Sequence, residues 1–374
     1  MSMPSRRGDP TIVAASLSKT YRVQKKPPGL LGSVRALVRR EYSDVRAVQD
    51  VSFAIERGEL VGFLGPNGAG KTTTLKMLSG LLEPSGGECR VLGYEPFKRE
   101  RPFQRQFALV LGQKNQLWWD LPAIESFLLN KEIYGLDARE YKATLDELVE
   151  LLGLAKLLDV QVRKLSLGER MKCELVGALL HRPKVLFLDE PTIGLDVVAQ
   201  QTIREFLKAY NARHGSTIVL TSHYMDDVKA LCERVVVIDR GQLIYDGALR
   251  DLVARFADDK LLTIELEREI PREALAAIGE VLTWEGRAAT IRVPREEVSA
   301  RAARLLAQFP VLDLAIQEPD IDEVIRALFG GTLAEAAPPA ETPPPAPLRL
   351  GEGREEGRDD GVTGEGVAAH GSDA

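Results

Sequence analysis

The sequence predicts an α/β fold, with a mixed sheet that has parallel strands at its centre, an inserted helical subdomain, and a small α+β domain after it. Short apolar runs ending in Gly or Asp alternate with longer amphipathic stretches, as in "LVGFLG" before "KTTTLKMLSGLL" and "KVLFLDE" before "VVAQQTIREFLKAY". This alternation is typical of parallel strands connected by helices. Between Ile124 and Leu158, apolar residues instead recur at threes and fours, which predicts the inserted helices.

The large sheet domain is expected to span residues 11–255, after a flexible N-terminus at residues 1–10. Its helical subdomain is expected at about residues 120–182, where the helical spacing of apolar residues is strongest. Each motif described below occurs once, and the chain contains no internal repeat. The sequence therefore predicts one such domain per chain.

A basic insertion at residues 24–43, "QKKPPGLLGSVRALVRREYS", separates two expected strands. Its apolar residues at helical spacing lie opposite arginines, and they are Leu30, Leu31, Val34, Leu37 and Val38. The pattern predicts a short amphipathic helix. Such a helix packs on the protein's own core or contacts lipid headgroups or a membrane partner, and the sequence leaves both alternatives open.

A small α+β domain is expected at residues 260–331. Three alternating strands, "LLTIELE", "ATIRVP" and "VLDLAIQ", are separated by helical stretches that begin at Arg272, Glu296 and Asp320. Residues 332–374 are rich in Pro, Gly and acidic residues. They have too few apolar side chains to offset the entropy of ordering, so we expect a disordered tail.

Composition and charge exclude several classes of function. The net charge of −6 comes from the tail, since residues 335–374 hold nine acids and three arginines and the rest of the chain is balanced. This balance argues against a nucleic-acid partner, because proteins that bind phosphate backbones usually carry a basic excess. Three widely separated cysteines predict neither a disulfide framework nor a zinc site. No apolar run approaches a membrane span of ~18 residues, so membrane work is expected to need a separate partner.

The stretch "GPNGAGKTT" follows an expected strand and opens an expected helix, the context that a phosphate-binding P-loop requires. Its glycines allow backbone N–H groups to curl around an anion, and the helix N-terminus adds its dipole. Lys71 is expected to reach the β- and γ-phosphates, and Thr72 to offer a hydroxyl to Mg²⁺. The residues expected to bind ATP are Gly65, Pro66, Asn67, Gly68, Ala69, Gly70, Lys71, Thr72 and Thr73.

Two carboxylates end the apolar strand "KVLFLDE". Asp189 is expected to bind Mg²⁺, and Glu190 to orient or deprotonate the attacking water. His223 ends the next apolar run, "TIVLTSH". A histidine alone is more often structural, but its place beside a P-loop favours a role in catalysis.

The motif "LSLGER", Leu165 to Arg170, completes a set by which the chain resembles the ATP-binding cassette (ABC) family, in the nucleotide-binding subunit of a transporter. The resemblance runs from about Thr11 to Val253 in the family's order. It comprises Tyr21 for the adenine, the P-loop, Gln113 after its strand, the signature at Ser166, Asp189 and Glu190, Asp196 in "GLD", and His223. The resemblance implies that Gln113 contacts Mg²⁺ and that Gln113, Lys71, Glu190 and His223 serve catalysis.

The resemblance also implies a dimer, most simply a homodimer, and a membrane partner. Ser166, Gly168 and Asp196 of one subunit are expected to complete the ATP site of the other. The sequences "EPTIGLD" and "IQEPDIDEVIRALF" most resemble two-component exporters of the daunorubicin-resistance type. They imply a peripheral ATPase on the cytoplasmic face of the cell membrane, driving a separate permease. An import cassette and a soluble regulatory cassette remain the alternatives.

The signature departs from the family's usual LSGGQ at two positions. Leu167 replaces a glycine, which predicts strain if that position needs a positive φ angle. Glu169 replaces a glutamine, which sets a negative charge near phosphates unless the side chain turns away or pairs with Arg170. A weakened site is the alternative that these two residues leave open.

Two adjacent tryptophans, Trp118 and Trp119, follow Gln113. Neighbouring residues face opposite sides of a strand and diverge by ~100° on a helix, so we expect at least one ring to face outward. With Asp120 they are expected to contact the permease, because a large rigid ring gives up much apolar area on docking. The alternative is that both rings pack between the two subdomains.

Overall fold

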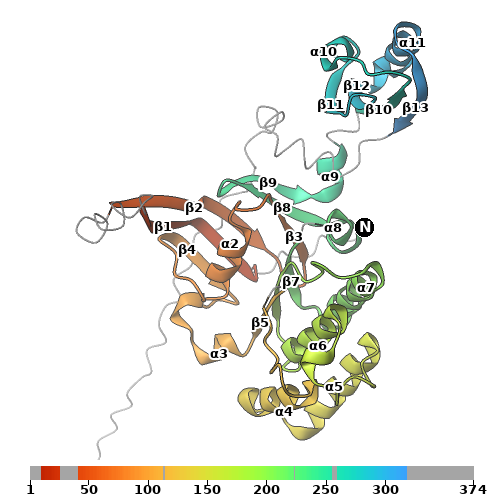
Figure 1. Cartoon of the computed structure of the whole chain (residues 1–374). Coiled ribbons are helices and arrows are strands. Elements are labelled where there is room, and N and C mark those ends of the chain that lie inside the picture. The colour runs from red at the N-terminus through yellow and green to blue at the C-terminus, as the bar shows by residue number, and fades with distance from the viewer. Residues whose placement is uncertain (1–9, 26–40, 113, 223, 255–258, 318–374) are drawn as a thin grey trace, which may run out of the picture.

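The computed structural model describes residues 10–25, 41–112, 114–222, 224–254 and 259–317. A six-stranded sheet forms its centre (Figure 1), with the strand order β5-β6-β7-β3-β8-β9. Its strands are β5 (Phe107–Leu111), β6 (Val185–Asp189), β7 (Thr217–Thr221), β3 (Leu60–Leu64), β8 (Arg234–Asp239) and β9 (Gln242–Ala248). The first five are parallel and β9 pairs antiparallel with β8. The predicted mixed sheet with a parallel centre is confirmed.

A three-stranded antiparallel sheet covers one face of the centre. It has the order β2-β1-β4, from β1 (Ile12–Lys25), β2 (Glu41–Ile55) and β4 (Gly86–Val91). Helix α2 (Lys71–Leu78) shares an apolar core with both sheets, in which Phe53 and Phe63 lie with ring centroids 5.7 Å apart. This core fixes the start of α2 against the end of β3, where the P-loop lies.

The long β1–β2 hairpin changes the limits of the predicted insertion. Pairing continues to Lys25 opposite Glu41, so residues 24–25 and 41–43 belong to strands and not to a helical segment. Extended pairing wins here because each strand continues a ladder that is already formed. The predicted amphipathic helix around Leu30 lies outside the described residues.

Helices form the other large core, beside β5 and β6 (Figure 1). The longer ones are α4 (Ala123–Tyr134), α5 (Ala138–Leu152), α6 (Leu167–Leu179) and α7 (Val197–His214). Shorter helices are η1 (Pro96–Lys98), α3 (Arg101–Gln104), η2 (Val162–Lys164), α8 (Met225–Leu231) and α9 (Leu249–Ala254). Helix α5 begins where Asp137 accepts hydrogen bonds from the N–H groups of Arg139 and Glu140, and it ends at Gly153 in the left-handed conformation. The predicted inserted helices are confirmed.

The C-terminal unit is a four-stranded antiparallel sheet packed against helices. The strand order is β11-β12-β10-β13, from β10 (Asp259–Leu266), β11 (Glu280–Trp284), β12 (Ala288–Pro294) and β13 (Val311–Gln317). Its helices are α10 (Arg272–Leu275), η3 (Arg295–Glu297) and α11 (Val298–Gln308). The sequence predicted three of the four strands. It missed β11, an edge strand in which only Val281 is buried, so no alternation marks it.

Two further sequence predictions for this part of the chain remain predictions. The helix expected from Asp320 and the tail at 332–374 lie outside the described residues, as do residues 1–9. Within the part that the structure describes, no helix has the length and apolar character needed to cross a membrane.

All three cysteines are free and buried: Cys89 in β4, Cys173 in α6 and Cys232 after α8. Burial raises the pKa of the Cys89 thiol to about 11. It raises the pKa of Cys173 to about 12, and that of Cys232 still further. Each thiol is therefore protonated at neutral pH, which makes it a weak nucleophile.

Candidate nucleotide-binding site

The predicted P-loop, residues 65–73, joins β3 to α2. Gly68 and Gly70 have φ angles of 81° and 107°, a left-handed region that side chains disfavour. Gly70 also lies so close to β2 that a Cβ atom there would be 2.5 Å from the Ala47 carbonyl oxygen. It directly precedes the first turn of α2, whose N–H groups have no carbonyl partner in the helix itself. The loop is therefore shaped by its glycines to present N–H groups to an anion.

Lys71 lies at the start of α2 with its amine folded back over the loop. Its Nζ atom donates hydrogen bonds to the carbonyl oxygens of Gly65 at 2.5 Å and Pro66 at 3.1 Å. Burial lowers the pKa of the Lys71 amine, while the carboxylates of Glu190 and Asp189 oppose that shift. The amine thus lies between the loop and the two acids that end β6.

The carboxyl ends of neighbouring parallel strands bring three side chains together. The Thr72 hydroxyl donates to the Asp189 carboxylate, with oxygen distances of 2.8 and 3.1 Å. The Thr221 hydroxyl donates to the same carboxylate at 2.7 Å, because Asp189 and Thr221 are register partners in β6 and β7. Oxygen ligands of this kind are the ones that Mg²⁺ prefers. Thr72 and Asp189 therefore fit the predicted magnesium site.

Glu190 follows β6 in an uncommon backbone conformation, with a φ angle of 55°. Its N–H group donates to both the carbonyl and the hydroxyl oxygen of Thr221, each at 3.1 Å. Gly112 lies directly against it, since a Cβ atom at Gly112 would be 2.1 Å from the Glu190 carbonyl oxygen. The loop after β5 and the end of β6 are thus in direct backbone contact.

Two predicted catalytic residues, Gln113 and His223, lie outside the described residues. The described residues Gly112 and Thr221 precede them in the chain, and both contact Asp189. The Gly112 N–H donates to the Asp189 carbonyl at 2.8 Å, and Thr221 contacts the Asp189 carboxylate. Gly112 and Thr221 therefore both lie against Asp189.

The signature motif starts helix α6 with a capping box. The Ser166 hydroxyl accepts from the Glu169 N–H at 3.3 Å, and the Glu169 carboxylate accepts from the Ser166 N–H at 2.9 Å. The predicted strain at Leu167 is absent, because Leu167 is the first residue of the helix and has no positive φ angle. Glu169 does not pair with Arg170 but turns back onto the helix start. Both departures from the family signature therefore have a structural explanation.

Gly168 and Asp196 also lie at helix starts. A Cβ atom at Gly168 would be 2.8 Å from that of Ala199, so glycine allows α6 to pack against α7. Asp196 caps α7 by accepting from the Ala199 N–H at 2.8 Å. Among the described residues, no hydrogen bond joins Ser166, Gly168 or Asp196 to the P-loop of the same chain.

Tyr21 lies in β1 opposite Val45, with its ring about one third exposed. The Lys19 ammonium group lies 5.7 Å from the centre of the ring. An exposed flat ring on a strand is available for stacking against a base. No described contact joins Tyr21 to the P-loop.

Both tryptophans are exposed, Trp118 at 54% and Trp119 at 44%. The alternative that both rings pack between the subdomains is therefore wrong. The reason is local: neither residue lies in a strand or helix, so both rings escape the alternation that regular structure imposes. The Arg170 guanidinium lies 5.2 Å from the centre of the Trp119 ring, and Asp120 pairs with Arg163 at 3.3 Å.

Trp118 lines a groove of about 640 Å³ between β5 and helices α4 and α6. The groove floor includes Glu174, which is 4% exposed and accepts from the N–H groups of Gln116 at 2.9 Å and Leu117 at 3.3 Å. Burial raises the pKa of the Glu174 carboxyl. A buried acid on the signature helix thus holds the segment that carries Trp118.

His181 also lines this groove and stacks on Tyr134, with ring centres 3.9 Å apart. Its Nε2 atom lies 3.1 Å from the Phe107 carbonyl oxygen. Burial lowers the pKa of His181 to about 4, so the ring is neutral at pH 7 and Nε2–H donates. His181 is therefore a packing element of this groove.

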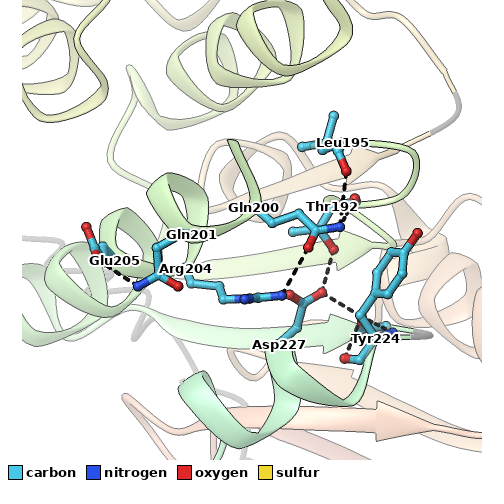
Figure 2. Close-up of polar contacts among 9 residues, drawn as sticks. Thr192, Leu195, Gln200, Gln201, Arg204, Glu205, Tyr224 and Asp227 are labelled. Carbon is cyan, nitrogen blue, oxygen red and sulfur yellow. Dashed lines mark hydrogen bonds and ion pairs between the residues drawn. The ribbon is translucent and has the colours of Figure 1, made fainter. Parts of the chain in front are cut away.

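The sequence analysis missed a buried polar network around Asp227, drawn in Figure 2. Asp227 lies in α8, is fully buried, and contacts Arg204, Thr192 and Ser222. The only feature of the sequence that could have indicated this network is an acid four positions after His223. That feature is weak, because Asp and Glu are common in the first turn of helices.

Comparisons with known proteins agree with this geometry. The model of the family described as "ABC transporter" matches residues 48–193, and that of "EvrA-like ABC transporter, C-terminal domain" matches residues 258–317. The linearmycin resistance ATP-binding protein LnrL of Bacillus subtilis is 32% identical over 308 residues, covering 80% of this chain and 98% of that protein. The chain belongs to the ATP-binding cassette family of transporters. It is an ATPase whose activity is coupled to transport.

Two more ABC proteins illustrate how far the similarity extends. The Nod factor export ATP-binding protein I of Cupriavidus pinatubonensis is 39% identical over 216 residues, 58% of this chain and 66% of that protein. A solved ATP-binding subunit of an ABC transporter superposes with a TM-score of 0.55 at 29% identity, covering 66% of this chain and 93% of the other. Both similarities cover about two thirds of this chain or less.

Proposed function

We propose that this chain is the motor of an export system, hydrolysing ATP with Mg²⁺ as a homodimer and driving a separate membrane permease. The observation that carries the proposal is the contact of Thr72 and Thr221 with Asp189, beside Lys71 and directly before Glu190. These side chains come from the ends of α2, β6 and β7. They provide in one place a phosphate-binding amine, metal ligands and a general base.

Each residue has a separate task in hydrolysis. The P-loop N–H groups and Lys71 hold the β- and γ-phosphates, for which the amine leaves the carbonyls of Gly65 and Pro66. Thr72 and Asp189 hold Mg²⁺, which neutralises the phosphate charge when bound. Glu190 accepts the proton of the attacking water. Its backbone has a positive φ angle and its N–H group makes two hydrogen bonds to Thr221, which together fix the position from which the side chain extends.

Gln113, His223 and Tyr21 complete the proposal on the order of motifs. Gln113 is proposed to contact Mg²⁺ and His223 to contact the transferred phosphate. Tyr21 is proposed to stack on the adenine, and its exposed ring supports that role. The described hydrogen bonds of the Asp189 carboxylate are made with Thr72 and Thr221 and do not involve these three residues.

The proposed homodimer uses the two helix starts described above. Ser166 caps α6 and Asp196 caps α7, so both lie where N–H groups and the helix dipole favour an anion. We propose that Ser166, Gly168 and Asp196 of one subunit complete the ATP site of its partner. Their lack of described contacts with their own P-loop supports this assignment.

The proposed permease contact comprises the groove lined by Trp118 and the two residues that follow it in the chain, Trp119 and Asp120. Two exposed rings beside a groove provide the apolar area and concave shape that an interface anchor requires. Export is proposed because a 39% identical relative is named as a Nod factor export protein. The subunit is then expected on the cytoplasmic face of the membrane, where ATP is available.

The C-terminal unit at residues 260–331 is proposed to regulate the cassette without touching phosphates. Its described residues form a closed apolar core between sheet and helices. The strands carry no glycine-rich turn that opens a helix. This supports a role in coupling or in dimer lifetime.

The experiment that tests the proposed function replaces Glu190 by glutamine. Glu190→Gln is expected to bind ATP and to lower the hydrolysis rate by about 100-fold or more, because general-base catalysis contributes factors of that size. Gel filtration is expected to show a stable dimer with ATP and monomer with ADP. Glu150→Gln, the same change at an exposed residue of α5, is the matched control and keeps the wild-type rate. Hydrolysis by Glu190→Gln at the wild-type rate would refute the role given to Glu190.

A further inference from the structure

One oxygen of the buried Asp227 carboxylate holds two separate loops (Figure 2). Its Oδ2 atom accepts hydrogen bonds from the hydroxyl groups of Thr192 and of Ser222, the latter at 2.7 Å. Thr192 lies two residues after Glu190, in the loop that follows β6. Ser222 is the first residue after β7 and follows Thr221, which contacts Asp189. A single acid therefore ties together the ends of the two strands that form the candidate site.

The other oxygen, Oδ1, accepts from the Arg204 Nε atom at 2.6 Å. The ring of contacts then closes through α7: Arg204 donates to the Gln200 side-chain oxygen at 3.3 Å, and the Gln200 amide donates to the carbonyl of Leu195 at 3.2 Å. It also reaches the Thr192 carbonyl, at 3.5 Å. Figure 2 shows Arg204 and Gln200 reaching from one helix to Asp227 and to the loop. The buried charge of Asp227 is thus paired and hydrogen-bonded, as buried charges must be.

Packing of α8 against α7 does not require this arrangement. The Asp227–Arg204 ion pair joins the two helices without Thr192, and buried apolar residues of both helices share one core. The bond from the Thr192 hydroxyl is not part of that contact, and it holds the loop at a position two residues after Glu190. Glu190 has a φ angle of 55°, and a non-glycine residue keeps such a conformation only where its surroundings over-determine it. The Thr221 bonds hold Glu190 from one side, and Thr192 holds the following loop from the other.

We propose that Asp227 is a positioning residue for ATP hydrolysis, which acts through the Thr192 hydroxyl to fix the direction of the Glu190 carboxylate. Asp227 does not touch the nucleotide. This inference rests on the role proposed for Glu190. It assigns to α8 and α7 a part in the chemical step, separate from the binding of ATP by the P-loop.

The test removes only the hydroxyl. Thr192→Val keeps the shape of the side chain and leaves the Asp227–Arg204 pair intact, so the fold is retained. We expect kcat for ATP to fall by at least about tenfold, because misplacement of a catalytic group by ~1 Å can cost a factor of about a hundred. KM for ATP is expected to stay within about twofold, because the P-loop contacts are unchanged. Thr192→Ser, which restores the hydroxyl, is expected to restore kcat.

Two controls separate positioning from folding. Thr202→Val makes the same change at a half-buried threonine of α7, whose hydroxyl donates to the Val198 carbonyl, and is expected to keep the wild-type kcat. Asp227→Asn is expected to lower kcat and the melting temperature together, because it leaves Arg204 without a counter-charge. Thr192→Val is expected to lower kcat no further when it is added to Asp227→Ala, because alanine already lacks the oxygen that accepts from the Thr192 hydroxyl.

Three outcomes would overturn the inference: a wild-type kcat for Thr192→Val, an equal loss for Thr192→Ser, or a loss confined to KM. Glu190→Gln, measured alongside, keeps the two proposals distinguishable. If Glu190→Gln abolishes hydrolysis while Thr192→Val does not, the proposed function stands and the role of Asp227 is wrong. If Glu190→Gln retains hydrolysis, the role of Glu190 is wrong, and with it the basis of this inference.

Discussion

Replacing Glu169 by alanine or by glutamine separates the two effects of the acidic residue in "LSLGER". Alanine removes the hydrogen bond from the Ser166 N–H and the negative charge in the first turn of α6. A capping bond is worth about 1 kcal/mol, and a charge at a helix start adds roughly 0.3–1 kcal/mol. Glu169→Ala should therefore destabilise the chain by about 1–2 kcal/mol. At roughly 2–4 °C per kcal/mol for a domain of this size, the melting temperature should fall by about 2–8 °C.

Glutamine keeps an acceptor for the Ser166 N–H and loses only the charge. Glu169→Gln should therefore lower the melting temperature by about 4 °C or less, and it restores the residue of the usual family signature. Since the carboxylate faces its own helix, we expect the ATPase rate of Glu169→Gln to stay within about twofold of the wild type. Thermal unfolding and steady-state ATPase assays measure the two quantities. A tenfold rise in the rate would mean that the acidic charge repels the phosphates, and the explanation from the capping box would be wrong.

Three other predictions concern the groove and the C-terminal unit. Trp118→Ala and Trp119→Ala should each melt within about 2 °C of the wild type, because both rings are exposed. At least one of the two variants should no longer co-purify with the permease. Early melting of both variants would mean that the rings are part of the core. His181 has a pKa of about 4 against a usual 6.5, so the unfolded chain binds an extra proton between these values and stability should fall as pH drops from 6.5 to 4. His181→Phe should remove that slope in urea unfolding measured at several pH values, and an unchanged slope would contradict the burial of a neutral ring. A chain ending at Arg255 should keep its ATP affinity and change only the dimer lifetime, whereas a large loss of affinity would argue against a regulatory role.

The parts of the site that could be predicted are those whose chemistry is written in consecutive residues. "GPNGAGKTT" defines a backbone shape through its glycines, so the loop and Lys71 follow from sequence alone. The position of Asp189 in the site could be predicted because ligands of open α/β sheets bind at the carboxyl ends of the strands, and Asp189 ends an apolar strand. The same local reasoning predicted the three C-terminal strands in which apolar and polar residues alternate. It missed β11, which lacks this alternation.

The parts that could not be predicted depend on residues that meet only in the folded chain. Thr192, Ser222 and Asp227 are ordinary polar residues at these positions in the sequence, and nothing there indicates that one carboxylate oxygen serves both hydroxyls. Glu169 was identified as an anomaly, but its resolution needed the geometry of the helix start. The exposure of both tryptophans also escaped prediction, because the argument from alternation assumed a regular element where the chain makes a turn.

The burial of all three cysteines makes the native chain convenient for spectroscopy. Cys89, Cys173 and Cys232 are each at most 8% exposed, and their thiols stay protonated, so maleimide reagents should leave the folded protein unlabelled. A single cysteine introduced at an exposed position would then carry a spin label or fluorophore without background and without first removing the native thiols. Pairs of labels on α5 and β2 would report directly, as a distance distribution, how far the helices move relative to the sheets when ATP is added.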